Sequence, residues 1–162
     1  MKRLLILLLL CIPAVAMGKT WQVDQARSTL GFDGSFQGQA FHGQFKKFSA
    51  DITFDPADLS TARFDVRVDL ASVDTQGSER DQTLTGSDFF AVSKYPQAHF
   101  VTQSFSKDAN GKVIAHGTLT LRGVSREVEL EVVFNQLERY PLPPWARTVG
   151  FSARTTISRE AF

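Results

Sequence analysis

The most chemically reactive side chains in this sequence are three histidines, several aspartates and one cysteine. His42, His99 and His116 lie far apart along the chain, and none stands in a metal-type spacing such as His-x-Glu or His-x-x-x-His. Zinc sites are normally built from closely spaced histidines or from cysteine thiolates. We therefore predict no metal site, and we expect each histidine to lie at a rim of the fold or in solvent.

Four aspartates, Asp24, Asp33, Asp81 and Asp88, could supply a general acid and a general base for hydrolysis. The sequence contains no Gly-x-Ser-x-Gly nucleophile elbow, no Walker loop and no dinucleotide-binding glycine loop. Nothing marks two of the aspartates as a pair whose pKa values differ. We predict that the protein has no catalytic residues and is not an enzyme, and a hydrolase with carboxylates at a rim is the weaker alternative.

Residues 1–18 have the features of a secretory signal peptide, with two basic residues, an apolar run of nine residues from Leu4 to Ile12, and a small-x-small cleavage site at Ala14–Ala16. A helix needs about 20 apolar residues to span a membrane. We therefore predict cleavage, export to the periplasm and no transmembrane segment in the mature chain. Cys11 lies inside the apolar run with no small residue directly before it, so we expect it to leave with the signal peptide.

The mature chain, residues 19–162, suits one domain with a single core. Two of the 18 basic residues belong to the signal peptide, which leaves 16 basic against 17 acidic residues. Nucleic-acid binding depends on many contacts between basic side chains and phosphates. We predict no nucleic-acid partner, and the composition leaves the oligomeric state open, a dimer included.

Alternation of apolar and polar residues dominates the mature chain. From Arg63 to Leu70 every second residue is apolar and those between are charged, and Glu127 to Val132 repeats the pattern. This period indicates strands with one dry face and one wet face, as in antiparallel sheets. Turn-forming residues separate such runs at 55–56, 108–111 and 122–124. Because closure removes exposed edges, we predict an all-β antiparallel barrel of about eight strands.

Two segments do not alternate. Residues 77–84 predict a short helix with Ser78 as its cap. Residues 140–145 contain three prolines, which exclude a regular helix or a central strand, so we expect a loop at a rim of the barrel.

The charged pair Arg80-Asp81 and the aromatic pair Phe89-Phe90 allow two interpretations. They could form a plug at one end of the barrel that contacts a ligand. Alternatively, the rings pin a loop to the core, and Asp88 caps the turn that follows it.

Phenylalanine contributes 14 residues, against two tyrosines and two tryptophans. Because a phenyl ring has no polar group to satisfy, it suits a dry interior. A packed core rich in phenylalanine and a lipid cavity lined by phenylalanine both fit this composition.

The order of several short motifs resembles that of the YceI-like periplasmic proteins, and the motifs cover nearly all of the mature chain. They are Trp21-Gln22-Val23-Asp24 with Ser28 and Phe32, Gly43-Gln44-Phe45, Ser72-Val73-Asp74-Thr75, Arg80-Asp81-Gln82-Thr83-Leu84, Asp88-Phe89-Phe90 with Tyr95-Pro96 and Phe100, Gly117 to Val124, and Ile157-Ser158-Arg159. Members typically continue beyond the Ile-Ser-Arg segment through at least one more strand. Either the sequence is a fragment or the protein is a shortened variant, and a missing last strand would leave two edges of the barrel open.

The resemblance implies a lipocalin-like antiparallel barrel that binds an isoprenoid lipid, polyprenyl or quinone-like, in the periplasm. Some members occur alongside membrane cytochromes of the b561 type, which suggests such a cytochrome as a partner. The resemblance supplies no catalytic residue and no cofactor apart from the bound lipid. The rival hypothesis is a filled barrel that acts by contact with a membrane protein.

Apolar residues of the alternating runs, together with the aromatic pair, are the predicted lipid-facing wall. They are Leu30, Phe32, Phe36, Phe45, Phe54, Phe64, Val66, Val68, Phe89, Phe90, Phe100, Leu119, Val132, Phe134 and Phe151.

Overall fold

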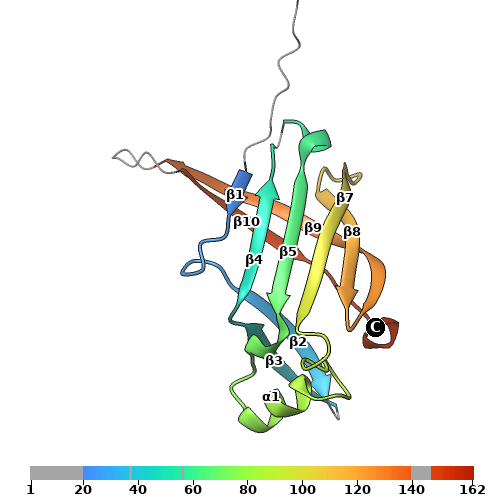
Figure 1. Ribbon diagram of the computed structural model, residues 1–162. Helices are drawn as coiled ribbons and strands as arrows, with labels where there is room; N and C mark the ends of the chain where they lie inside the picture. Colours follow the sequence, from blue (N-terminus) through green and yellow to red (C-terminus); the bar gives the residue numbers. More distant parts are fainter. Residues whose placement is uncertain (1–19, 37, 56, 140–146) are drawn as a thin grey trace, which may run out of the picture.

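The computed structural model describes residues 20–36, 38–55, 57–139 and 147–162, and it consists mostly of antiparallel strands (Figure 1). The predicted signal peptide and the predicted rim loop at 140–145 lie outside the described residues. A seven-stranded sheet follows the order β1-β4-β5-β7-β8-β9-β10. Its strands are β1 (Thr20–Gln22), β4 (Phe48–Thr53), β5 (Arg63–Asp69), β7 (Gln97–Lys107), β8 (Val113–Leu121), β9 (Val124–Arg139) and β10 (Arg147–Arg154).

A three-stranded sheet covers one end of the seven-stranded sheet, in the order β2-β3-β6 (Figure 1). Its strands are β2 (Leu30–Phe36), β3 (Gln39–Phe45) and β6 (Val73–Asp74). The helical elements are η1 (Leu59–Thr61), η2 (Leu70–Ser72), α1 (Ser78–Thr85) and η3 (Arg159–Ala161). Helix α1 lies at the same end of the molecule as β2 and β3.

The predicted fold class is confirmed, because the seven strands curl into a nearly closed antiparallel barrel and a short helix accompanies it. The barrel sheet has seven strands, where about eight were predicted, and β2, β3 and β6 form a separate sheet. The strands β1 and β10 are the two end strands of the barrel sheet.

Two of the predicted turns connect strands as expected, and Pro56 of the third lies outside the described residues. Arg122 and Gly123 link β8 to β9 with φ values of 51° and 75°, both in the left-handed region that a two-residue hairpin turn requires. The carboxylate of Asp108 accepts hydrogen bonds from the backbone N–H of Asn110 and of Lys112, which closes the turn between β7 and β8.

Helix α1 forms where the sequence predicts a helix, but the prediction that Ser78 caps it was wrong. Gly77 is the N-cap, with an extended backbone and no side-chain bond to the helix. The backbone is already helical at Ser78, so its hydroxyl is one residue too late to cap the first turn.

One half of the barrel is a packed core. Phe54, Phe64, Ala115 and Val132 are buried together, and none of them is more than 4% exposed. The ring of Phe54 lies 5.1 Å from that of Phe151 in an edge-to-face contact, which is the geometry that aromatic quadrupoles favour. This end of the barrel therefore contains side chains, as one of the two interpretations of the phenylalanine content predicted.

Replacing Phe64 by alanine should lower the free energy of unfolding by about 3–5 kcal/mol, because the ring is 3% exposed and its loss leaves a cavity in close-packed surroundings. Urea unfolding measures the change. The matched control is Phe134→Ala, whose ring is 38% exposed and should lose less than half as much. Equal losses in the two variants would contradict the location of the core.

Candidate functional site

The other half of the barrel contains a cavity of about 910 Å³, whose lining includes residues of β2, β3 and α1. Figure 1 shows these three elements at one end of the molecule. This volume falls in the range of small-molecule sites in proteins, about 300–1,000 Å³. Its apolar lining comes from strands of both sheets, from the segment around α1 and from the residues after β10. These residues are Leu30, Phe32, Phe41, Phe45, Val68, Leu70, Leu84, Phe89, Phe90, Ala98, Leu119, Leu121, Ile157 and Phe162.

The register between neighbouring strands determines which residues form the inner wall of the cavity. Val68 of β5 lies directly opposite Ala98 of β7, and Leu119 of β8 lies opposite Phe100 of β7. Residues in register on neighbouring strands present their side chains to the same face of the sheet. The small side chain of Ala98 leaves space at its level, and that space belongs to the cavity.

A contact between Phe100 and Gly117 lies where the open half meets the packed half. A Cβ at Gly117 would lie only 2.6 Å from Cζ of Phe100 and 2.5 Å from the carbonyl oxygen of Val101, so only glycine fits beneath this ring. Along β8, Ala115 belongs to the packed core on one side of Gly117, and Leu119 lines the cavity on the other.

Phenyl rings from three segments form the opposite wall. The ring of Phe45 lies 5.2 Å from that of Phe32 and 5.8 Å from that of Phe90. The ring of Phe32 lies over Gly43, where an added Cβ would come within 2.5 Å of it. These rings join the β2–β3 hairpin to the segment that follows α1.

A contact between Thr75 and Asp81 anchors the segment that carries α1. The backbone N–H and the hydroxyl of Thr75 both donate to the carboxylate of Asp81, at 2.9 and 2.7 Å. Gln76 and Ala91 both have positive φ values, 60° and 49°, which are uncommon for residues other than glycine. Residues between them, including Leu84 and Phe90, close one end of the cavity.

Part of the predicted wall lines this cavity, and a contact with lipid remains a prediction for all of its members. The seven residues that line it are Leu30, Phe32, Phe45, Val68, Phe89, Phe90 and Leu119. The side chain of Phe36 lies outside the described residues.

The remaining predicted residues are placed elsewhere. Six of them form the packed core or contact it, namely Phe54, Phe64, Val66, Val132, Phe134 and Phe151. Phe100 is buried over Gly117. All of these residues point to the inside of the barrel, as the cavity residues do. The alternation of apolar and polar residues predicts which face of a strand a residue lies on, but not how far along the barrel axis it lies.

Several lining residues were missed by the sequence analysis. Ala98 lies two residues before the predicted Phe100 on β7, and Leu121 lies two residues after the predicted Leu119 on β8. Both therefore point inward, and continuing the alternation along these strands would have identified them. Phe41 belongs to the hairpin wall, and Ile157 and Phe162 follow the last strand, where no alternation marks them.

The histidines are separated from one another in the structure. His42 bonds to Asp33 at 2.9 Å, His99 to Asp65 at 2.8 Å, and the ring of His116 lies between Ser106 and Glu129. Within the described ranges no group of three or more His, Cys, Asp or Glu side chains could hold a metal ion.

The four aspartates considered for hydrolysis do not converge on one site. Asp24 accepts from the backbone N–H of Ala26, while Asp33 and Asp81 make the contacts given above. Asp88 is exposed, and a hydrogen bond from the hydroxyl of Ser87 reaches its carboxylate. The turn cap predicted for Asp88 is absent from the described hydrogen bonds.

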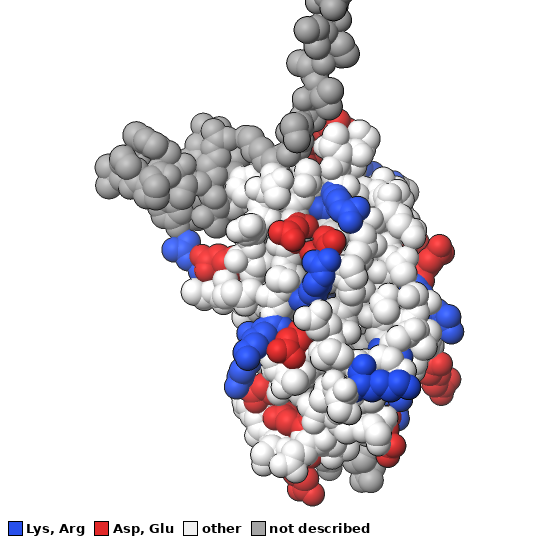
Figure 2. Space-filling view, viewed as in Figure 1, with Lys and Arg blue, Asp and Glu red and all other residues white. Residues whose placement is uncertain are grey.

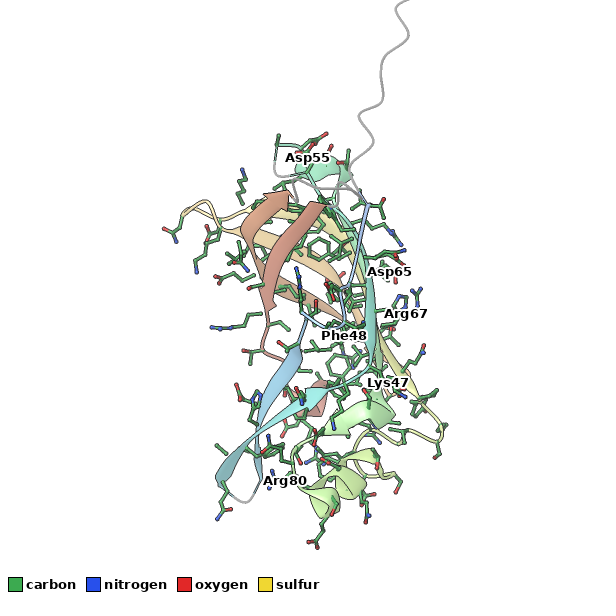
Figure 3. All side chains as sticks on the ribbon, turned by 90° about the vertical axis from the view of Figure 1, so that its left-hand side faces the viewer. Lys47, Phe48, Asp55, Asp65, Arg67 and Arg80 are labelled. Carbon is green, nitrogen blue, oxygen red and sulfur yellow. The ribbon has the colours of Figure 1, made fainter. Side chains whose placement is uncertain are left out.

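The charges on the face of β4, β5 and β7 are of both signs and interspersed (Figure 2). Asp65 and Arg67 lie on the outer surface of β5 (Figure 3) and form an ion pair at 3.0 Å. The hydrogen bond from His99, together with the charges of Arg67 and Arg63, holds the pKa of Asp65 below its usual range. No described helix is long and apolar enough to cross a membrane.

Comparisons with known proteins all lead to one family. A family model described as YceI-like domain matches residues 21–162. A UPF0312 protein of Shewanella baltica is 30% identical over 157 residues, which cover 94% of this chain and 81% of that protein. Protein YceI of Escherichia coli is 37% identical over 122 residues, 75% of this chain and 62% of that protein.

Two crystal structures are similar to this one. Burkholderia cenocepacia BcnA has a TM-score of 0.66 at 32% identity, with 70% of this chain and 72% of that chain covered. The Campylobacter jejuni YceI protein has a TM-score of 0.63 at 34% identity, with 81% of this chain and 76% of that chain covered.

Replacing Asp81 by alanine should leave the N–H and the hydroxyl of the buried Thr75 without a partner and lower the free energy of unfolding by about 1–3 kcal/mol. Amide hydrogen exchange of residues 76–91 should accelerate, because this contact anchors the segment. Asp88→Ala is the control, since Asp88 is exposed, and should stay within about 0.5 kcal/mol of the parent. Unchanged exchange in Asp81→Ala would show that the segment is anchored elsewhere.

Proposed function

The chain belongs to the YceI-like family, and we propose that it carries or buffers an isoprenoid lipid, polyprenyl or quinone-like, in the cavity at one end of its barrel. The observation that carries the proposal is the cavity of about 910 Å³, walled by phenylalanine and aliphatic side chains beside a packed core. A barrel that worked only through its outer surface would have no need of such a volume.

The energetics of apolar burial support this kind of ligand. Burying one CH₂ group is worth about 0.8 kcal/mol, so a five-carbon isoprene unit contributes roughly 3–4 kcal/mol before ordering costs. The free energy gained by burying a few such units exceeds the cost of association, about 4–15 kcal/mol. Because one methylene changes affinity in an apolar pocket by only about 1–3 kcal/mol, we expect selection by bulk and length to be modest.

The proposed role is binding and not catalysis, and the proposed location is the periplasm. Residues 1–18 predict export, and a carrier of apolar lipid would act between the membranes. A membrane cytochrome of the b561 type is the proposed partner if the bound lipid is quinone-like.

Native mass spectrometry of protein purified from the periplasm tests the proposal directly. We expect a discrete additional mass, which solvent extraction of the same sample identifies as a prenyl lipid. A protein without lipid that also takes up neither ubiquinone nor polyprenol would favour the filled barrel that acts by protein contact.

Filling the cavity should weaken binding without disturbing the packed core. Ala98→Phe places a ring in the space beside Val68, and we expect the affinity of the delipidated protein for geranylgeraniol to fall about tenfold or more. Ala109→Phe adds the same group in the exposed turn between β7 and β8, and should bind like the parent. Fluorescence titration measures both, and equal affinities would place the ligand outside this cavity.

A further inference from the structure

The cavity stops at one level of the barrel, and three neighbouring strands share that level. Strands β5, β7 and β8 lie side by side (Figure 1). On β5, Val68 lines the cavity and Val66 packs against the core, and on β8 the same change occurs between Leu119 and Ala115. On β7 the residue at this level is Phe100, which lies opposite Val66 on one side and Leu119 on the other. Phe100 is therefore placed between the two halves of the barrel.

The ring of Phe100 closes the bottom of the cavity. It reaches past its partner Leu119 and covers Gly117, which lies two residues nearer to the packed core on β8. Because a Cβ at Gly117 would lie 2.6 Å from Cζ of the ring, the ring fills the space that a side chain at this position would take. Phe100 is only 6% exposed, although Leu119 opposite it lines the open cavity.

The level beneath the ring is closed as well. Thr102 lies opposite Gly117 and is buried, and its hydroxyl oxygen accepts a hydrogen bond from the backbone N–H of Phe64 at 2.8 Å. The ring of Phe64 lies 5.1 Å from that of Phe105 and 5.9 Å from that of Phe151. A lipid chain that passed Phe100 would have to displace these closely packed rings, which is unfavourable.

A closed bottom limits how much of a lipid chain the protein can bury. In a membrane every unit of a prenyl chain already lies in apolar surroundings. A carrier that takes the lipid from a membrane therefore gains nothing from units that fit its cavity, but it exposes to water every unit that does not fit. Since the exposure of apolar carbon to water is unfavourable, each surplus unit opposes loading.

We propose that Phe100, seated on Gly117, is the floor of the cavity and sets the longest chain that the protein loads from a membrane. The proposal rests on the proposed function and deepens it, because it names the residue that limits chain length. Chains that differ by one methylene are still separated only modestly, whereas chains that differ by a whole isoprene unit beyond the limit are separated clearly.

The test measures loading of the delipidated mature protein, residues 19–162, from phosphatidylcholine vesicles. Each vesicle sample contains the same mole fraction of one prenyl alcohol, namely geraniol, farnesol, geranylgeraniol, geranylfarnesol or hexaprenol. After the vesicles are removed by centrifugation, the lipid bound to the protein is extracted and quantified by mass spectrometry. We expect similar loading for the chains that fit, and a fall of about tenfold or more for each unit beyond the limit.

Substitutions at the floor should move this limit. Phe100→Ala removes about as many carbon atoms as one isoprene unit contains, so the limit should rise by about one unit. Phe100→Leu keeps an apolar side chain in the core and should raise the loading of the first excluded chain severalfold. The matched control is Phe64→Leu, which removes the same atoms below the floor and should keep the length profile of the parent.

Urea unfolding shows which variants are folded, and Phe100→Leu decides the test if Phe100→Ala is not. A length profile that the folded Phe100 variants leave unchanged, or a shift in Phe64→Leu as large as that in Phe100→Leu, would overturn the floor and leave the lipid carrier in place. Loading by the parent that does not fall at any length up to hexaprenol would overturn the floor in the same way. Loading of none of these alcohols would overturn the carrier itself.

Discussion

The contact of the Phe100 ring with Gly117 is the constraint on which the interior of this barrel depends. No side chain can grow from position 117 without meeting the ring or the carbonyl oxygen of Val101. The ring therefore lies directly against the backbone of β8, at the level where the packed core ends and the open space begins. On the core side Ala115 is completely buried, and on the open side Leu119 faces the cavity.

Much of the fold could be predicted from the sequence, because the period of apolar residues reports the face of each strand. Val66 and Val68 show the limit of that information. Both point inward, yet Val66 packs against the core and Val68 lines the cavity. Which one meets open space depends on the residues at the same height on β7, Phe100 and Ala98, and this pairing requires the register between strands.

The polar contacts of the site were less predictable for a related reason. Asp81 was considered for acid–base chemistry, but it stabilises a loop by accepting two hydrogen bonds from Thr75, six residues earlier. Arg122 was noted only as part of a turn, and its place in the cavity lining follows from the approach of that turn to the loop at Ser87. Neither contact has a periodic signal in the sequence, because the first depends on the local backbone before α1 and the second joins segments far apart in the chain.

The cavity opens to solvent, so it does not stay empty. It contains either water, which finds no hydrogen-bond partner on the phenyl and aliphatic side chains of the wall, or a molecule with an apolar surface. Removal of apolar surface from water favours the second by about 25 cal/mol per Å² buried. The packed core of Phe54 and Phe64 lies in the other half of the barrel, so the fold can hold its shape while the cavity contents change.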